Sequence, residues 1–371
     1  MPLYLTEDQA MLRDTAREFM AGEGSIAGQL RKYRDMGCKD GFGHALWKQF
    51  GEMGFNGILV PEADGGLGLG HVEAGIVLEE IGRHLTPSPF LITAVAVVEA
   101  LKGTALRERW YPGILSGETV AALAVDEGAK HRPETIAMQA ERAGNGFRLT
   151  GRKQFVVQGA SADLIVVAAR AEEGVTLFAV ERDAKGLAVE GLRLADSSIG
   201  ARMDFQGVEV DADAVIGDVG GGEAVLRRVL DAGRAGAASE MVGLGSAAMA
   251  MTVDYLKQRK QFGRAIGEFQ VLQHRSAHLY SELEIARAAA LKAQQLLDEG
   301  AEEAEAMVSV AKAKAGWAST LAVQEGVQMH GGIGMTDEYD IGLYMKRDRV
   351  LNELFGDPSY HADKLARMKG Y

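Results

Sequence analysis

The chain has 371 residues, with 40 basic and 52 acidic side chains, and its net charge of −12 argues against nucleic acid or an anionic membrane as a partner. Hydrophobic residues make up 47% of the chain, which is enough for a large core spread over two or three domains. One cysteine, Cys38, excludes an internal disulfide and an all-cysteine metal site, and the eight histidines show no metal-binding spacing, so we expect no metal.

Residues 1–118 predict an α-helical domain. Thr6 and Gln9 form a capping-box pattern ahead of an amphipathic run, and a further helix begins near Leu46 and stops at Gly54. The first ten residues have no signal-peptide character, and no apolar run approaches the length of a membrane span. We therefore expect a cytoplasmic protein without a membrane span.

Residues 119–222 predict a middle β domain, folded as a small barrel or sandwich. Short apolar runs are separated by Gly, Asp and Ser, at 121–125, 147–157, 164–170, 175–181, 187–194 and 203–210. Strands and helices do not alternate here, so a Rossmann nucleotide site is not expected.

Residues 223–371 are helical again, which gives an α+β multidomain chain. One helix carries an apolar stripe at Met241, Leu244, Ala248, Met251 and Tyr255. It ends in a basic turn at 257–260, and a second helix follows the glycines at 263 and 267. Such a corner suits a phosphate-bearing ligand, but an ordinary helical hairpin with a charged turn would show the same spacing.

Two motifs favour the ligand-binding alternative. The first is Arg259-Lys260-Gln261-Phe262-Gly263, followed by Ile266-Gly267 and Phe269-Gln270. The second is Gln328-Met329-His330-Gly331-Gly332-Ile333-Gly334, followed by Arg347-Asp348. Both resemble the acyl-CoA dehydrogenase family, and the chain's ending resembles the small subunits of bacterial members such as pimeloyl-CoA dehydrogenase.

The resemblance implies an N-terminal helical domain, a middle β domain and a C-terminal four-helix bundle, with FAD between the last two. It implies that Arg259, Gln261 and Phe262 contact the FAD pyrophosphate and adenosine. The adenine end would be contacted by Gln270, Gln328, Gly331 and Gly332, partly across a dimer interface. Two glycines would let the backbone approach an anionic group without a Cβ in the way.

The resemblance also implies an oxidoreductase of β-oxidation or of lipid and ring-compound catabolism. It would remove hydrogen from Cα and Cβ of an acyl-CoA thioester to give the 2-enoyl-CoA, and pass electrons to an electron-transfer flavoprotein. The assembly would be a homodimer, a homotetramer or a heterotetramer with a homologous subunit. Another flavin chemistry on the same fold, an oxidase or monooxygenase, stays open.

The residues at the positions of the catalytic base differ from the family's pattern. The family's glutamate stands in one of two places, and Gly356 and Gly233 occupy them here. Asp357, one residue later, is one candidate base, unless it only forms a turn with Pro358. Glu240 is a second, unless it forms an ion pair. The third reading is a catalytically degenerate subunit whose partner chain supplies the base.

The middle domain departs as well. Val125-Asp126-Glu127 replaces the family's Thr-Glu-Pro segment, and Phe155-Val156-Val157 replaces its Trp-Ile-Thr segment. The hydroxyl groups that would bond the flavin edge are therefore missing, which leaves backbone amides to serve.

Overall fold

The computed structural model describes residues 3–371, which divide into two compact units. The unit we call the sheet unit comprises Gln29–Gly70 and Pro87–Gly233. The unit we call the bundle unit comprises Met1–Gly28, His71–Thr86 and Arg234–Tyr371. Helix α7 (Gly222–Gln258) contributes residues to both. No described helix is both long and apolar enough to cross a bilayer.

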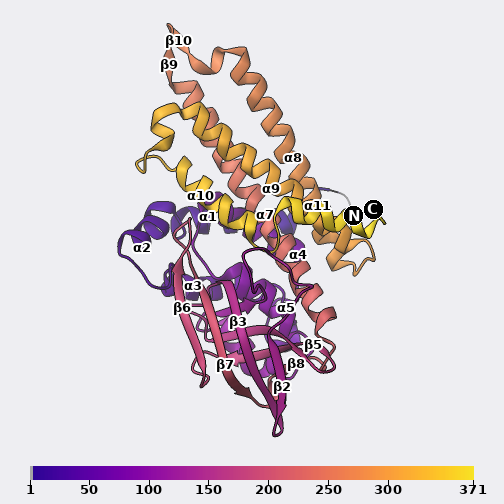
Figure 1. Cartoon of the computed structure of the whole chain (residues 1–371). Coiled ribbons are helices and arrows are strands. Elements are labelled where there is room, and N and C mark those ends of the chain that lie inside the picture. The colour runs from indigo at the N-terminus through magenta and orange to yellow at the C-terminus, as the bar shows by residue number, and fades with distance from the viewer. Residues whose placement is uncertain (1–2) are drawn as a thin grey trace. The chain divides into compact units, whose positions relative to one another are not determined.

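The sheet unit is built on one eight-stranded sheet, drawn from magenta to pink in Figure 1. Its strands are β1 (Ala121–Ala124), β2 (Gln139–Ala143), β3 (Gly146–Val157), β4 (Leu164–Ala171), β5 (Gly174–Glu181), β6 (Leu187–Arg193), β7 (Ile199–Val210) and β8 (Val215–Ile216). They pair in the order β6-β7-β3-β2-β4-β5-β8, and β1 pairs in parallel with β4. The predicted β-rich middle region is thus confirmed.

Apolar residues on one face of these strands form the core of the sheet unit. Phe147, Phe178, Met203 and Phe205 are all buried there, because side chains alternate between the two faces of each strand. The sequence prediction missed β2, whose Ala140 is its one buried residue and whose neighbours are mostly exposed. A strand of this kind shows no apolar run.

Short helices complete the sheet unit. They are α2 (Lys32–Asp35), α3 (His44–Glu52), α5 (Val98–Leu101) and α6 (Leu106–Leu115), with a π-helical turn at Leu91–Val97. The expected stop after α3 is confirmed, since Gly54 adopts φ 78°, a conformation that favours glycine.

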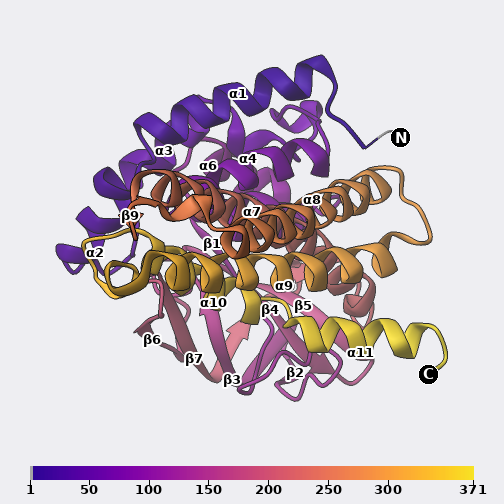
Figure 2. The same ribbon diagram turned by 90° about the horizontal axis from the view of Figure 1, so that it is seen from above.

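The bundle unit consists of packed helices. They are α1 (Glu7–Gly22), α4 (His71–His84), α8 (Gln270–Asp298), α9 (Ala304–His330), α10 (Ile341–Glu353) and α11 (Pro358–Met368), with part of α7. Figure 2 shows α8 and α9 running side by side. The predicted capping box at the start of α1 is present, since Thr6 Oγ1 accepts from Gln9 N at 3.2 Å.

Candidate functional site

The basic corner after α7 is a tight hairpin. Strands β9 (Lys260–Gln261) and β10 (Arg264–Ala265) pair across Phe262 and Gly263, which have φ values of 54° and 79°. Two positive φ values in a two-residue loop match the turn whose twist suits a hairpin. The loop holds the Phe262 side chain out to solvent, with 91% of its surface exposed.

Cationic and aromatic groups gather at this hairpin. Arg259 and Gln261 are exposed, and the Arg264 guanidinium lies 4.2 Å from the Phe269 ring centroid. The Phe262 and Phe269 rings meet edge to face at 6.2 Å. Gln270 is the first residue of α8, at the same corner. The corner therefore presents donors for an anion beside flat rings on which a base can stack.

The second motif ends α9 at its C-terminus. Gly331 has φ 65°, and a Cβ built on Gly331 or Gly332 would meet no atom within 4 Å. The backbone here is open to a ligand. Gln328 lies almost one turn earlier on α9, and its side chain is exposed.

The structure brings the two motifs together within one chain. The Tyr255 ring, near the end of α7, stacks on His330 with centroids 4.5 Å apart. His330 is 3% exposed, and its Nδ1 lies 2.7 Å from Gly326 O. Burial lowers the pKa of His330. The His330 ring therefore packs between the end of α7 and the end of α9.

These residues fit an FAD dinucleotide. An exposed arginine corner suits the pyrophosphate, the open Gly331–Gly332 backbone admits a close approach, and the exposed Phe262 ring suits an adenosine. Within residues 3–371 no group of three or more His, Cys, Asp or Glu side chains could hold a metal ion.

The turn after α10 is where the family's catalytic glutamate is expected, and it is crowded. Gly356 has φ 103°, and a Cβ added there would lie 2.4 Å from Tyr360 Cδ1. Arg234, which is 2% exposed, donates from Nε to Phe355 O at 3.2 Å and from Nη2 to the Tyr360 hydroxyl at 3.3 Å. The Tyr360 ring, together with His361 Nε2 at 3.1 Å, therefore fills the direction that a side chain at position 356 would take, and Arg234 holds that ring through its hydroxyl group.

Both candidate carboxylates in the bundle unit already have structural partners. Asp357 caps α11, with its Oδ1 accepting from Tyr360 N at 2.8 Å. Glu240 is 2% exposed, and its Oε1 pairs with Arg347, at 2.6 Å from Nη2 and 2.8 Å from Nε. These are the turn and the ion pair that the sequence left open as alternatives to a catalytic role.

A buried lysine that the sequence analysis did not single out supports this turn. Lys312 Nζ donates to the carbonyls of Leu351, Asn352 and Gly356 at 3.0, 3.4 and 2.9 Å. Burial and the nearby Arg234 lower the pKa of Lys312 to about 7. The sequence could have revealed Lys312, because it lies four residues after the apolar Val308 and so interrupts the apolar, core-facing stripe of α9.

Asp348, next to Arg347, has a structural role. It accepts from Ser319 Oγ at 2.5 Å and from Thr320 Oγ1 at 2.9 Å, which ties α10 to α9. Burial raises the pKa of Asp348 above its ordinary value. The Arg-Asp pair of the second motif thus holds helices together.

In the sheet unit, the segment at Val125–Glu127 borders a hollow of about 310 Å³. Lys153, fully buried, donates to Val125 O at 3.0 Å and to Glu127 Oε1 at 2.7 Å. Partial burial acts to raise the pKa of Glu127, but this lysine and two backbone amides outweigh it and lower the pKa. The segment is therefore held by charge pairing where the family has hydroxyl groups.

Comparisons with known proteins agree with this arrangement. The descriptions "Acyl-CoA dehydrogenase, N-terminal domain", "middle domain" and "C-terminal domain" match residues 6–118, 123–208 and 220–369.

Individual proteins from this family match over most of their length. Isovaleryl-CoA dehydrogenase of Solanum tuberosum is 32% identical over 326 residues, 83% of this chain and 78% of its own. Acyl-CoA dehydrogenase FadE12 of Mycobacterium tuberculosis is 31% identical and covers 93% of this chain and 91% of its own. A solved variant of the Tcur3481-Tcur3483 steroid ACAD superposes with a TM-score of 0.90 at 29% identity, covering 98% of each chain. The chain has the helical, sheet and helical domains of the acyl-CoA dehydrogenases and belongs to that family, which is a family of flavoproteins.

Proposed function

We propose that the protein takes part in FAD-dependent α,β-dehydrogenation of an acyl-CoA thioester to the 2-enoyl-CoA. The flavin supplies the hydride acceptor when bound. Arg259 and Gln261 would hold its pyrophosphate, Phe262 its adenosine, and Gln270, Gln328, Gly331 and Gly332 its adenine end. A soluble electron-transfer flavoprotein would take the electrons, in cytoplasmic catabolism of lipids or ring compounds.

We also infer that this chain acts with a homologous partner chain that brings the catalytic carboxylate. The observation that carries this proposal is the crowded turn at Gly356, where Tyr360 lies in the path of any side chain. Abstraction of the α-proton needs a base within hydrogen-bonding reach of substrate. Asp357 and Glu240 are instead tied to Tyr360 N and to Arg347. The two protein names in the steroid relative are consistent with a paired assembly.

The absorption spectrum of the protein purified alone tests both parts of the proposal. We expect flavin bands that do not bleach when a panel of acyl-CoA thioesters is added without another chain. Bleaching by the lone chain would show that it has its own base and would overturn the paired reading. Colourless protein that also fails to take up added FAD would contradict the flavin assignment.

Two variants test the proposed role of Arg259 in flavin binding and the structural role of Asp357. Arg259→Ala should lower the flavin content of the purified protein or assembly, because it removes a charge-assisted donor worth about 1.5–3 kcal/mol.

Asp357→Asn should leave activity of the assembled enzyme unchanged, because asparagine also caps helices. Loss of activity in Asp357→Asn with flavin retained would instead identify Asp357 as the base.

A further inference from the structure

A cavity of about 450 Å³ lies within the bundle unit, away from the residues assigned to FAD above. It is bordered by α1, α4, α7 and α8 and by the chain at Leu3–Leu5. Small-molecule sites occupy roughly 300–1,000 Å³, so the space is large enough for a ligand.

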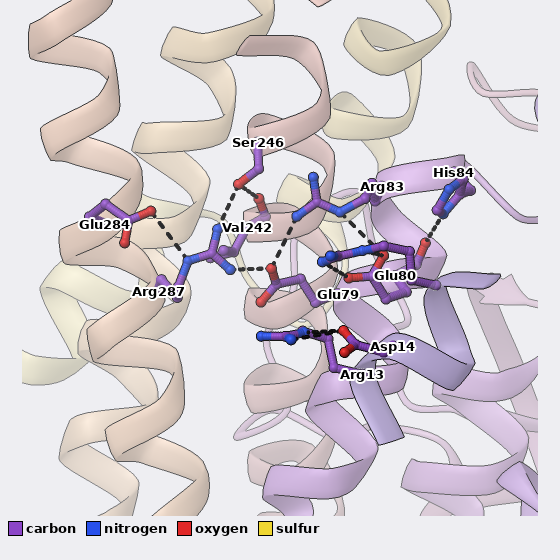
Figure 3. Close-up of polar contacts among 11 residues, drawn as sticks. Arg13, Asp14, Glu79, Glu80, Arg83, His84, Val242, Ser246, Glu284 and Arg287 are labelled. Carbon is purple, nitrogen blue, oxygen red and sulfur yellow. Dashed lines mark hydrogen bonds and ion pairs between the residues drawn. The ribbon is translucent and has the colours of Figure 1, made fainter. Parts of the chain in front are cut away.

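One wall of the cavity is a network of ion pairs, shown in Figure 3. Glu79 lies between Arg287 of α8 and Arg83 of α4, and pairs with both. Arg287 also donates to Ser246 Oγ at 2.9 Å and pairs with Glu284 at 3.4 Å. Glu79 is therefore neutralised from two sides.

A second carboxylate lies behind the wall. Glu80 is fully buried and accepts a two-pronged contact from Arg17, Nη2 to Oε1 at 2.8 Å and Nε to Oε2 at 3.2 Å. Arg83 Nε lies 3.2 Å from the same carboxylate. On α1, Arg13 pairs with Asp14, whose side chain is 63% exposed.

The side chains that face the cavity carry a net positive charge. Four arginines line it, Arg13, Arg17, Arg83 and Arg287, against two carboxylates, Glu79 and Glu284. Asp14 and Glu80 are not part of the lining. A guanidinium has five N–H donors, and the contacts of Arg13 and Arg17 with described residues use Nε and Nη2. Nη1 of both arginines is left to a ligand.

Apart from Tyr4, Ser239 and Gln294, the remainder of the lining is apolar. Val72 and Ile76 of α4, Val242 of α7 and Leu291 of α8 contribute to it, with the small side chain of Ala288. At one position α4 and α8 touch, since a Cβ on Gly75 would lie 1.9 Å from Gln294 Nε2. The cavity thus joins an arginine-rich part to an aliphatic part.

We propose that this cavity binds an amphipathic carboxylate of the medium-chain fatty-acid type. The carboxylate would accept from Arg13 and Arg17, and the alkyl chain would lie along Val72, Ile76, Val242 and Leu291. A carboxylate suits guanidinium groups through charge-assisted hydrogen bonds, and burial of the alkyl chain adds roughly 0.8 kcal/mol per CH₂. The site does not depend on the proposed dehydrogenation.

Titration calorimetry of the full-length protein, carrying whatever flavin it retains, tests this proposal with decanoate as the probe and decanol as its uncharged match. We expect decanoate to bind at least tenfold more tightly than decanol, and acyl-CoA not to displace it. Equal affinity for the two, displacement by acyl-CoA or no binding of decanoate would each overturn the proposal.

Two variants locate the site. Ala288→Phe fills the cavity and should weaken decanoate at least tenfold, whereas Ala21→Phe on the exposed part of α1 should not. Arg13→Gln removes one donor but leaves the buried Glu80 pairs intact, and should weaken decanoate about three- to tenfold without affecting decanol. If Ala288→Phe does not fold, Arg13→Gln decides the matter, and an unchanged affinity in the folded variant overturns the proposal.

Discussion

Lys312 shows how one side chain shapes the turn after α10. Its Nζ reaches three carbonyls at the end of that helix, where a cation also suits the helix dipole. Phe355 and Gly356, the turn residues it supports, have φ values of 61° and 103°. A backbone in this region is strained for phenylalanine, so the lysine helps to hold a turn that the local sequence alone would not favour.

The stability of the protein should therefore depend on pH through Lys312. Its pKa is about 7 in the folded chain and near the ordinary 10.5 when unfolded. Between these values the unfolded state binds more protons, so the free energy of unfolding should rise with pH. Denaturant titrations from pH 7.5 to 10 should show wild type gaining about 1 kcal/mol per pH unit relative to Lys312→Met. If the free energies of unfolding of the two proteins changed with pH in parallel, the lowered pKa of Lys312 would be contradicted.

Helices α4 and α7 cross in the bundle unit at a pair of glycines. A Cβ on Gly82 would lie 2.0 Å from Glu240 O, and one on Gly243 would lie 1.8 Å from Glu79 O. Backbone therefore packs against backbone at this crossing. The crossing also fixes the position of Glu79 beside Arg287 and of Glu240 beside Arg347.

Gly243→Ala should force these helices apart and lower the free energy of unfolding by about 2 kcal/mol or more. The matched control is Gly342→Ala on α10, where a Cβ comes no closer than 3.8 Å to Gly334 O. That change should leave stability unchanged or raise it by up to about 1 kcal/mol, because alanine favours helix. Thermal unfolding measures both variants, and equal effects would show that the crossing is not tight.

At the scale of the whole molecule, large apolar side chains lie exposed on the packed pair α8 and α9. Tyr280 is 57% exposed, Ile285 52% and Trp317 54%. Exposed aromatic and aliphatic groups on long helices are typical of subunit contacts. This agrees with an oligomer built through the C-terminal helices.

Trp317→Glu should accordingly weaken self-association or association with a homologous chain. The measurement is the molar mass in solution by light scattering, with the mass of the variant falling toward the 39.6 kDa of one chain as it is diluted. Met36→Glu, at a 70% exposed position outside α8 and α9, serves as the control and should leave the mass unchanged. A variant that keeps the wild-type mass at every dilution would exclude Trp317 from the interface.

The sequence by itself determined the local elements and the family. Apolar periodicity located several of the helices and most strands, and the Thr6–Gln9 pattern located a helix start. The motifs at 259–263 and 328–334 identified acyl-CoA dehydrogenase relatives. These features are local in the chain, so they can be read from spacing. The sequence did not predict strand β2, because most residues of this strand are exposed and form no apolar run.

The tertiary structure decided what the local patterns left open. It placed Tyr360 against Gly356, gave Glu240 its partner Arg347, and buried Lys312 under the same turn. Glu240 and Arg347 are 107 residues apart, and Lys312 and Gly356 are 44 apart. Spacing along the chain reports which residues share one helix face, whereas the partner of a buried charge depends on how separate helices pack.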